Sequence, residues 1–283
     1  MAARPAWTIS NSPSGHGDKR RMAKLAGKIA IVTGGGTGIG RSTALMLAAE
    51  GAHVVVSGRR RAPLEAVVAE IAKAGGKAVA REGDVSRPEQ GRALVEWTVK
   101  ELGRVDILIN NAGHSSKARN VRWVGQEEWD AVINVNLTGV YALIQAALPN
   151  MIERGGGSIV TVGSVAAIRP GLIGGAPYGA AKAGVLNLMG HVHTVLRDKG
   201  IRATTVMPAE VDTPILDNRP LPPDAAARAT MMQPEDVAEA ILMCVTLPAR
   251  TVVEEIVLSP TRTRDQSHDV EVARNLGAPR GAR

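Results

Sequence analysis

The chain has 283 residues, of which 45% are hydrophobic and 22% are charged, and it contains one cysteine. This length is enough for one large domain or two small ones with a full core, and a single cysteine excludes an internal disulfide bond. The formal net charge of +7 belongs to the two ends, because residues 1–28 hold six basic residues and one acidic, and residues 260–283 hold five and three. The body is therefore nearly neutral, and we expect no nucleic-acid partner.

The two ends also differ from the body in their patterning. Residues 1–24 form a basic, proline- and glycine-containing extension that is predicted to be disordered, and residues 260–283 show no clear period and are predicted to be poorly ordered. No run of about 18 apolar residues occurs, so no membrane-spanning segment is expected, and the N-terminal segment lacks the apolar stretch of a secretory signal. With only Cys244 as a thiol, these features favour a cytoplasmic protein.

Residues 25–259 form the predicted domain, in which short aliphatic runs alternate with helical stretches. The predicted strands are 29–33, 51–57, 77–81, 105–110, 158–162, 201–206 and 252–258, and the predicted helices between them are 38–50, 62–74, 88–102, 127–154, 178–199 and 234–247. Continuous apolar strands that alternate with helices are typical of strands buried on both faces. We therefore predict an α/β fold, a single doubly wound domain with a seven-stranded parallel sheet and helices on both faces. Residues 214–229 are predicted to be a flap over the site.

A glycine-rich turn joins the first predicted strand to the first helix. Glycine backbone N–H groups approach a pyrophosphate closely, and a helix N-terminus favours a bound anion, so this turn is predicted to bind a dinucleotide in a Rossmann fold. The alternative is that the glycines serve packing alone. The candidate residues are Gly34, Gly36, Thr37, Gly38, Ile39 and Gly40, with three residues rather than one between the first two glycines of the pattern.

The end of the second predicted strand indicates which dinucleotide binds. An NAD-binding unit usually places a carboxylate here, whereas this chain has Arg59 and Arg60 after a serine and a glycine. Guanidinium groups bind a 2′-phosphate well, so NADP(H) is preferred and NAD(H) is the alternative cofactor. Arg59 is the first candidate and Arg60 the second. The same arginines could instead be a solvated run at the start of a helix.

Tyr178 and Lys182 are four residues apart in a predicted helix and therefore lie on one face of it. An ammonium group beside a phenol lowers the pKa of the phenol, which would make Tyr178 a general acid and base near neutral pH. A surface tyrosine and a solvated lysine with this spacing by accident are the alternative.

These features together resemble the short-chain dehydrogenase/reductase family over residues 25–259. The matching segments are 33–40, 83–85, 110–113, 134–136, 163–164, 178–182 and 208–214. The resemblance implies an oxidoreductase that transfers a hydride between the nucleotide and a carbonyl or secondary alcohol, with a catalytic tetrad of Asn136, Ser164, Tyr178 and Lys182. Tyr178 would exchange the proton, Ser164 would hold the substrate oxygen, Lys182 would bind the nicotinamide ribose, and Asn136 would anchor a water.

The resemblance also implies further cofactor-binding positions along the carboxyl ends of the strands. These are Asp84, Val85, Asn111, Ala112, Gly113, Pro208, Val211 and Thr213, together with Tyr178 and Lys182. A non-catalytic sensor or scaffold of the same fold is the alternative function, but such a protein would be expected to have lost tetrad residues, and none is lost here.

The substrate pocket is predicted from the loops that flank these positions. Its candidates are His114, Ile168, Arg169, Leu172, Glu210, Ile215 and Leu216, which lack aromatic rings and suit a small or medium carbonyl or alcohol. His114 is either a second acid/base or merely solvated, and Glu210, where the family commonly has glycine, either selects a substrate with a donor or cationic group or faces solvent, which we favour. No metal site is predicted.

Self-association is predicted from the apolar character of two helices, 127–154 and the helix of Tyr178. Apolar residues extend beyond one stripe on both, and a helix that is apolar around more of its surface should be covered. In the resembling family such helices pair across subunits, which implies a homodimer or homotetramer. The residues concerned are Val140, Leu143, Ala147, Val185, Leu188 and Met189.

Overall fold

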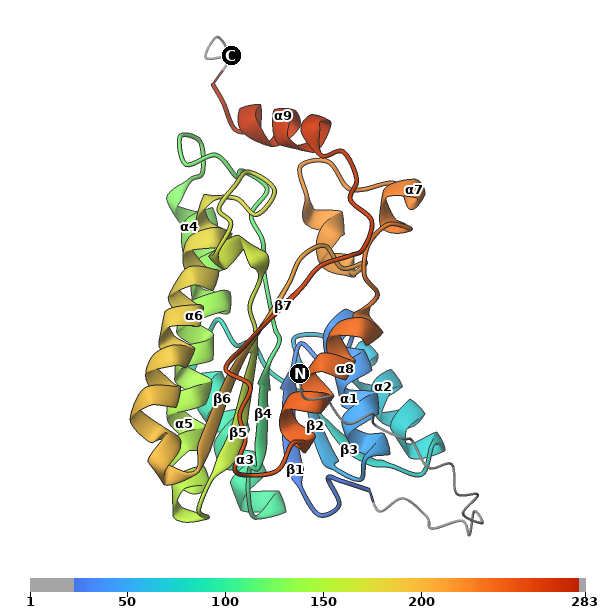
Figure 1. Ribbon diagram of the computed structural model, residues 1–283, viewed down its shortest axis with the longest axis vertical. Helices are drawn as coiled ribbons and strands as arrows, with labels where there is room; N and C mark the ends of the chain where they lie inside the picture. Colours follow the sequence, from blue (N-terminus) through green and yellow to red (C-terminus); the bar gives the residue numbers. More distant parts are fainter. Residues whose placement is uncertain (1–22, 280–283) are drawn as a thin grey trace, which may run out of the picture.

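The computed structural model describes residues 23–279, so the predicted disorder of the N-terminal extension falls on residues that lie outside the described part, apart from its last two. Within residues 23–279, seven parallel strands form one sheet in the order β3-β2-β1-β4-β5-β6-β7, which confirms the predicted fold class (Figure 1). The strands are β1 (Ile29–Thr33), β2 (His53–Gly58), β3 (Lys77–Glu82), β4 (Ile107–Asn110), β5 (Gly157–Val162), β6 (Ile201–Pro208) and β7 (Glu255–Leu258).

Helices cover both faces of this sheet (Figure 1). One face carries α1 (Gly38–Ala49), α2 (Arg61–Lys73) and α8 (Pro234–Thr246), and the other carries α3 (Pro88–Leu102), α5 (Gly139–Glu153) and α6 (Ala176–Leu196). The remaining elements are α4 (Gln126–Ile133), η1 (Asn134–Thr138), η2 (Val165–Ala167), η3 (Arg197–Lys199), η4 (Pro214–Asn218), α7 (Ala225–Arg228) and α9 (Ser267–Asn275).

Two aliphatic cores follow from the alternation of side chains along the strands. In β1, Ala30 and Val32 belong to the core under α1, α2 and α8, whereas Ile31 belongs to the core under α3, α5 and α6. The same alternation separates Val54 from Val55 in β2. Because the strand order reverses direction between β1 and β4, the carboxyl ends of these two strands form the switch point at which open α/β sheets bind ligands.

Three predicted strands begin later than expected, since β2 begins at His53 rather than at residue 51 and β7 at Glu255 rather than at residue 252. Strand β4 begins at Ile107 rather than at residue 105, because the N–H of Val105 donates to the Asn150 side chain at 3.0 Å instead of joining the sheet. The predicted flap contains the short helices η4 and α7, and the side chain of Asp224 caps α7 by accepting from the N–H of Ala227 at 2.8 Å.

The helical stretch Gln126–Glu153 combines α4, the π-helical turn η1 and α5. Among the described residues it alone has the length and mean hydropathy (1.5) of a membrane-crossing helix, a test that core helices of globular proteins also pass, and 44% of its most apolar window is buried in the fold. Burial within the fold therefore accounts for less than half of this apolar window. The residues that suggested self-association are largely buried in the same way: Val140, Leu143, Ala147, Val185 and Met189 are each at most 5% exposed.

The segment after residue 260 was predicted to be poorly ordered, but it contains a helix. Residues 267–275 form α9, which Figure 1 shows at the top of the molecule, beyond the strand ends. Asn120 donates to the carbonyl of Arg274 at 2.9 Å, and Gly277 packs against Trp123. Sequence patterning missed this segment because it is held by contacts with residues distant in the chain rather than by an apolar period of its own.

Candidate active site

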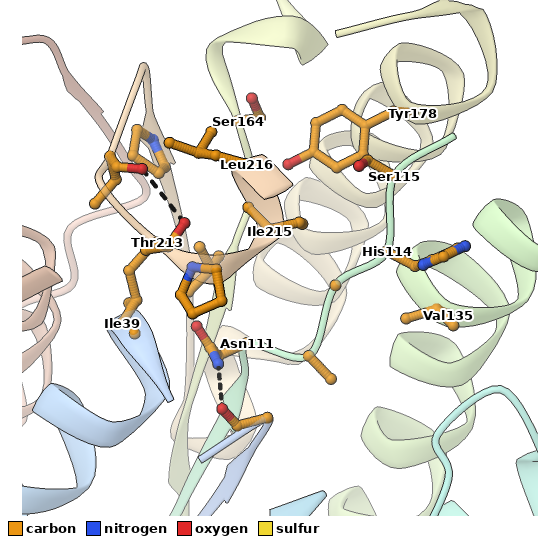
Figure 2. Close-up of a pocket in the computed structure, with 18 of the residues that line it drawn as sticks. Ile39, Asn111, His114, Ser115, Val135, Ser164, Tyr178, Thr213, Ile215 and Leu216 are labelled. Atoms are coloured by element: carbon orange, nitrogen blue, oxygen red, sulfur yellow. Dashed lines mark hydrogen bonds between the residues drawn. The ribbon is translucent and has the colours of Figure 1, made fainter. Parts of the chain in front are cut away.

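A cavity of about 680 Å³ lies at the carboxyl ends of the strands, where loops from both halves of the sheet meet (Figure 2). The loops after β1, β2, β3, β4, β5 and β6 all contribute to its lining. This is the position expected for a ligand site in a doubly wound sheet, since the switch point between β1 and β4 leaves a crevice there.

The glycine turn forms one end of the cavity. Gly34 and Gly38 have positive φ angles, +63° and +51°, which permit the tight turn from β1 into α1. Thr37 precedes α1 without capping it through its side chain, so the first N–H groups of the helix remain available to an anion. Five of the six predicted residues of this turn line the cavity: Gly34, Gly36, Thr37, Gly38 and Ile39.

Gly40 does not line the cavity and serves packing instead. A Cβ atom at this position would lie 2.3 Å from the carbonyl oxygen of Gly34 and 2.4 Å from Nδ2 of Asn111. That Nδ2 donates to the carbonyl oxygens of Thr33 at 2.9 Å and Gly34 at 3.2 Å, and so fixes the turn against the end of β4. The requirement for glycine at position 40 is therefore explained by packing alone, whereas the five predicted residues that line the cavity can contact a ligand.

The end of β2 brings two guanidinium groups to the same cavity. Arg59 and Arg60 are both exposed and both line it, whereas Arg61 does not. Arg61 instead pairs with Glu65 at 2.6 Å on the outer surface of α2. The remaining predicted cofactor positions also line the cavity: Asp84, Val85, Asn111, Ala112, Gly113, Pro208, Val211 and Thr213.

Together these residues fit a phosphorylated dinucleotide. The glycine turn offers free N–H groups at the start of α1. At Gly36 a Cβ atom would lie 3.0 Å from Pro63, so glycine lets the turn pack closely against the start of α2. Arg59 and Arg60 add positive charge at the position where an NAD-binding protein usually has a carboxylate. Positive charge at this position favours a 2′-phosphate, which a carboxylate would repel.

Tyr178 and Ser164 both line the cavity (Figure 2). Tyr178 is partly buried, with the rest of its surface open to the cavity, and this burial raises the pKa of its phenol above the usual value of 10.0. The nearby hydroxyl of Ser164 and the charges of Arg119 and Arg219 act in the opposite direction. Ser164 Oγ also accepts from the N–H of Ala166 at 3.2 Å, which caps the short helix η2.

Lys182 lies deeper, one helical turn after Tyr178 on α6. Its ammonium donates to the carbonyl of Val162 at 2.7 Å and lies 5.4 Å from the centre of the Tyr178 ring. Burial lowers the pKa of Lys182 to about 8. The expected lowering of the Tyr178 pKa is therefore not observed, because burial acts on both groups and the lysine directs its hydrogen bond to the backbone.

Asn136 is fully buried in the π-helical turn η1 and does not line the cavity. Its Nδ2 donates to the carbonyls of His114 at 2.7 Å and Val132 at 2.8 Å, and its Oδ1 accepts from the N–H of His114 at 3.4 Å. The side chain therefore fixes the backbone of His114 at the start of the loop after β4.

The predicted substrate residues divide into two groups. His114, Arg169, Leu172, Ile215 and Leu216 line the cavity, but Ile168 does not, and its side chain is exposed. Burial and the charge of Arg59 lower the pKa of His114, which favours its neutral form at neutral pH.

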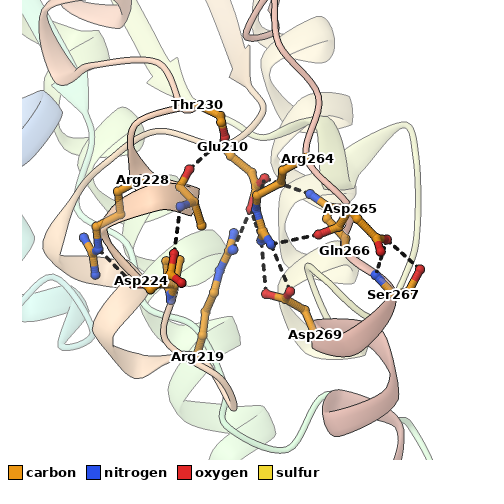
Figure 3. Close-up of polar contacts among 12 residues, drawn as sticks. Glu210, Arg219, Asp224, Arg228, Thr230, Arg264, Asp265, Gln266, Ser267 and Asp269 are labelled. Carbon is orange, nitrogen blue, oxygen red and sulfur yellow. Dashed lines mark hydrogen bonds and ion pairs between the residues drawn. The ribbon is translucent and has the colours of Figure 1, made fainter.

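Glu210 lines the cavity but does not face solvent as expected. Its side chain is 13% exposed and accepts hydrogen bonds from Arg219 at 2.6 Å, from Arg264 at 2.8 and 3.0 Å and from Gln266 at 2.8 Å (Figure 3). Desolvation would raise the pKa of this carboxyl, but the two arginines and the glutamine outweigh it and lower the pKa to about 2. The prediction was wrong because Arg264 and Gln266 come from the segment expected to be poorly ordered.

Several lining residues had no signal in the sequence. Ser115 and Arg119 come from the loop between β4 and α4, Arg219 from the flap, and Gln266 and Val270 from the C-terminal segment. Single residues in loops belong to no periodic pattern or motif, so the sequence did not distinguish these lining residues from neighbouring residues that face solvent.

Comparison with known proteins agrees with this geometry. A family model described as short chain dehydrogenase matches residues 28–222. The chain is similar to a 3-oxoacyl-acyl-carrier-protein reductase from Thermotoga maritima, with 35% identity over 243 residues that cover 83% of this chain and 96% of the relative. It is also similar to a cyclohexanol dehydrogenase from an Acinetobacter species, with 38% identity over 202 residues that cover 70% and 79%.

Solved structures give the same result. The structure of a metagenomic short-chain oxidoreductase in complex with NADP has a TM-score of 0.74 and 31% identity to this chain, and the match covers 85% of this chain and 100% of the other. A short-chain dehydrogenase/reductase from Mycobacterium marinum gives a TM-score of 0.76 at 30% identity, with 84% and 96% covered. The chain therefore belongs to the short-chain dehydrogenase/reductase family of NAD(P)-dependent oxidoreductases.

Proposed function

We propose that the protein transfers a hydride between NADP(H) and a small or medium carbonyl or secondary alcohol, with Tyr178 as the group that exchanges the proton. The observation that carries this proposal is that Tyr178, Ser164 and Lys182 line the same cavity as the glycine turn. The raised pKa of Tyr178 keeps its phenol protonated at neutral pH, which suits the donation of a proton to a carbonyl oxygen.

Each of the other tetrad residues has a role that its contacts support. Ser164 accepts a hydrogen bond from Ala166, so its own proton can go to the phenol oxygen of Tyr178 or to the substrate oxygen. Lys182 uses one N–H on Val162 and keeps two for the ribose hydroxyls of the nucleotide. Asn136 acts as a positioning residue, because both of its amide donors hold backbone carbonyls and one of these fixes the loop at His114.

NADP(H), when bound, supplies or accepts the hydride. Gly34, Gly36 and Ile39 would hold the pyrophosphate at the start of α1, and Arg59 would pair with the 2′-phosphate, with Arg60 as a second contact. The metagenomic oxidoreductase bound to NADP supports this assignment by its similarity.

The relatives agree on the reaction but differ in the carbonyl or alcohol on which they act. One is named for a 3-oxoacyl chain on a carrier protein and another for cyclohexanol, so relatives of comparable identity act on different molecules. The side chains at the substrate end, Leu172, Ile215 and Leu216, are aliphatic and favour a compact apolar body next to the reacting carbon.

The proposal is tested by following the absorbance of reduced nicotinamide with a panel of ketones, aldehydes and 3-oxoacyl thioesters. The wild-type protein is expected to oxidise NADPH with at least one of them. Replacing Tyr178 with Phe is expected to reduce turnover by about a thousandfold or more, with the NADPH dissociation constant within about twofold of wild type. Retained turnover in Tyr178→Phe would overturn the mechanism, and cofactor binding without turnover of any carbonyl would favour a sensor.

We also propose that the protein is cytoplasmic and acts as a homodimer or homotetramer. The exposed apolar side chains on α5 and α6, Tyr141 and Val195, are 46% and 56% exposed and support a contact on this side. Size-exclusion chromatography with light scattering is expected to give two or four chains per particle, and a monomer at micromolar concentration would contradict the assembly.

A further inference from the structure

Arg119 is a buried charged side chain without a partner. The residue is 4% exposed and lines the cavity, and its guanidinium makes no hydrogen bond or ion pair with any residue in 23–279. Its Nε atom is buried and unsatisfied within that part of the chain. An unpaired buried charge is unfavourable, so a guanidinium kept in this state on a cavity wall points to a ligand that completes it.

The neighbouring charges do not supply the missing partner. Glu210 and Asp269 are both engaged by Arg264, and Arg219 binds Glu210 as well, so this cluster contains two anions and two cations (Figure 3). The cluster is neutral without Arg119 and leaves it no free carboxylate.

Glu128, the remaining nearby acid, is also engaged elsewhere. Its carboxylate accepts from the backbone N–H groups of Lys117 and Ala118 and does not bond Arg119. Arg119 is therefore one positive charge that the described protein does not neutralise locally.

The backbone holds Arg119 in a fixed position. Its carbonyl accepts from the N–H of Ala176 at 2.8 Å, which ties the loop after β4 to the start of α6. Gly175 has a φ of +84°, and a Cβ there would lie 2.9 Å from Cγ of Arg119, so only glycine makes room for the arginine stem. The stem is thus packed while the guanidinium stays unpaired, which is a preorganised arrangement for binding.

Arg119 also lies close to the proposed reaction centre. Its charge acts on Tyr178, and Tyr178 in turn acts on Arg119. Ser115, on the same loop, also lines the cavity, and its buried hydroxyl has no partner among the described residues. The loop after β4 therefore brings an unpaired cation to the cavity wall within electrostatic reach of Tyr178.

We propose that Arg119 binds a carboxylate on the substrate, so that the substrates are oxo acids or the corresponding hydroxy acids. This inference rests on the proposed function for the reaction itself, but the anion subsite can be tested separately from it. The planar guanidinium is suited to a carboxylate through two parallel hydrogen bonds. The aliphatic residues Leu172 and Ile215, which line the same cavity, would pack on the carbon chain.

The binding experiment uses the full chain saturated with NADP⁺, so that a ketone binds but cannot be reduced. Isothermal titration calorimetry compares pyruvate, acetoacetate and levulinate with their neutral amides. For at least one pair, the carboxylate is expected to bind about tenfold or more tighter than the amide. Equal affinity within all three pairs, or no measurable binding of any carboxylate, would overturn the proposal without the use of any variant.

Two substitutions then locate the subsite. Arg119→Gln is expected to remove the carboxylate preference, and Arg119→Lys to keep part of it, because lysine retains the charge but not the paired geometry. The control is Arg122→Gln, an exposed arginine on the same loop that stacks on Trp123 at 4.3 Å and does not line the cavity. A preference that survives in Arg119→Gln, or disappears in Arg122→Gln, would contradict the assignment to Arg119.

Turnover with NADPH distinguishes failure of this inference from failure of the proposed function. Reduction of neutral ketones without a carboxylate preference would reject the subsite and leave the oxidoreductase function intact. Tight, Arg119-dependent carboxylate binding without reduction of any carbonyl would support the subsite and reject the function.

Discussion

The carboxylate of Glu210 accepts hydrogen bonds from Arg264 at 2.8 and 3.0 Å, and this pair joins the loop after β6 to the segment that leads into α9. Arg264 also donates to both oxygens of Asp269, at 2.9 and 3.0 Å, and Arg219 of the flap reaches Glu210 at 2.6 Å. One cluster of charges therefore connects the flap, the end of β6 and the C-terminal segment at the substrate end of the cavity.

The first prediction concerns the pH dependence of stability through Glu210. The carboxyl pKa is lowered from 4.5 to about 2 in the folded protein, so its stabilising effect is complete above pH 4.5 and is lost as the pH falls toward 2. Glu210→Gln is expected to lower the free energy of unfolding by about 1–3 kcal/mol at neutral pH, because two arginines lose their counter-charge. Urea denaturation at several pH values would show the difference from wild type shrinking below pH 4.5, and a constant difference would argue against the ion pair as its cause.

The second prediction concerns the C-terminal segment, which forms part of the cavity wall near the proposed substrate. Gln266 and Val270 line the cavity, whereas the glycine turn lies at its other end. Removal of residues 261–283 is expected to raise the KM for the carbonyl by about tenfold, because the site loses apolar and polar contacts at the substrate end. The NADPH dissociation constant, measured by fluorescence, should stay within about twofold. A loss of NADPH affinity equal to the loss of carbonyl affinity would show that the segment supports the whole fold instead.

Much of this site could be read from the sequence, and the part that could not has a common cause. The glycine turn and the Tyr178–Lys182 spacing depend on local geometry, in which a helix places residues four apart on one face. The conformation of Gly38 and the position of Ser164 after β5 are likewise properties of a few consecutive residues.

Arg119, Glu210 and Arg264 depend instead on contacts across the chain. Whether a loop arginine is solvated or buried without a partner is decided by which distant carboxylates already have partners, and no local pattern carries that information. The pKa of Tyr178 was mispredicted for the same reason, since the spacing to Lys182 gave their separation along the helix but not the burial around both groups.

The third prediction follows from the ionisation of Lys182 and Tyr178. The pKa of Lys182 is lowered from 10.5 to about 8, and that of Tyr178 is raised above 10.0, so the charged lysine and the protonated phenol coexist below pH 8. The value of kcat/KM for carbonyl reduction is therefore expected to be level near neutrality and to fall above about pH 8 as Lys182 loses its proton. Initial rates with saturating NADPH across this range provide the measurement. A rate that rises steadily through pH 8 would contradict these roles, because reduction consumes the proton of the phenol and the loss of protons from Lys182 and Tyr178 cannot accelerate it.

The last prediction concerns the choice of dinucleotide and uses the three consecutive arginines as their own control. Arg59 lines the cavity, whereas Arg61 is 75% exposed, pairs with Glu65 and stays outside it. A hydrogen bond to a charged group contributes about 1.5–3 kcal/mol, so Arg59→Ala is expected to weaken NADPH binding by about ten- to a hundredfold. NADH has no 2′-phosphate, so its affinity should be unchanged in this variant, and Arg61→Ala should alter neither. If Arg61→Ala weakened NADPH as much as Arg59→Ala, the effect would come from the general positive field at the start of α2 and not from a contact with the phosphate, because only a direct contact distinguishes two neighbouring arginines of equal charge.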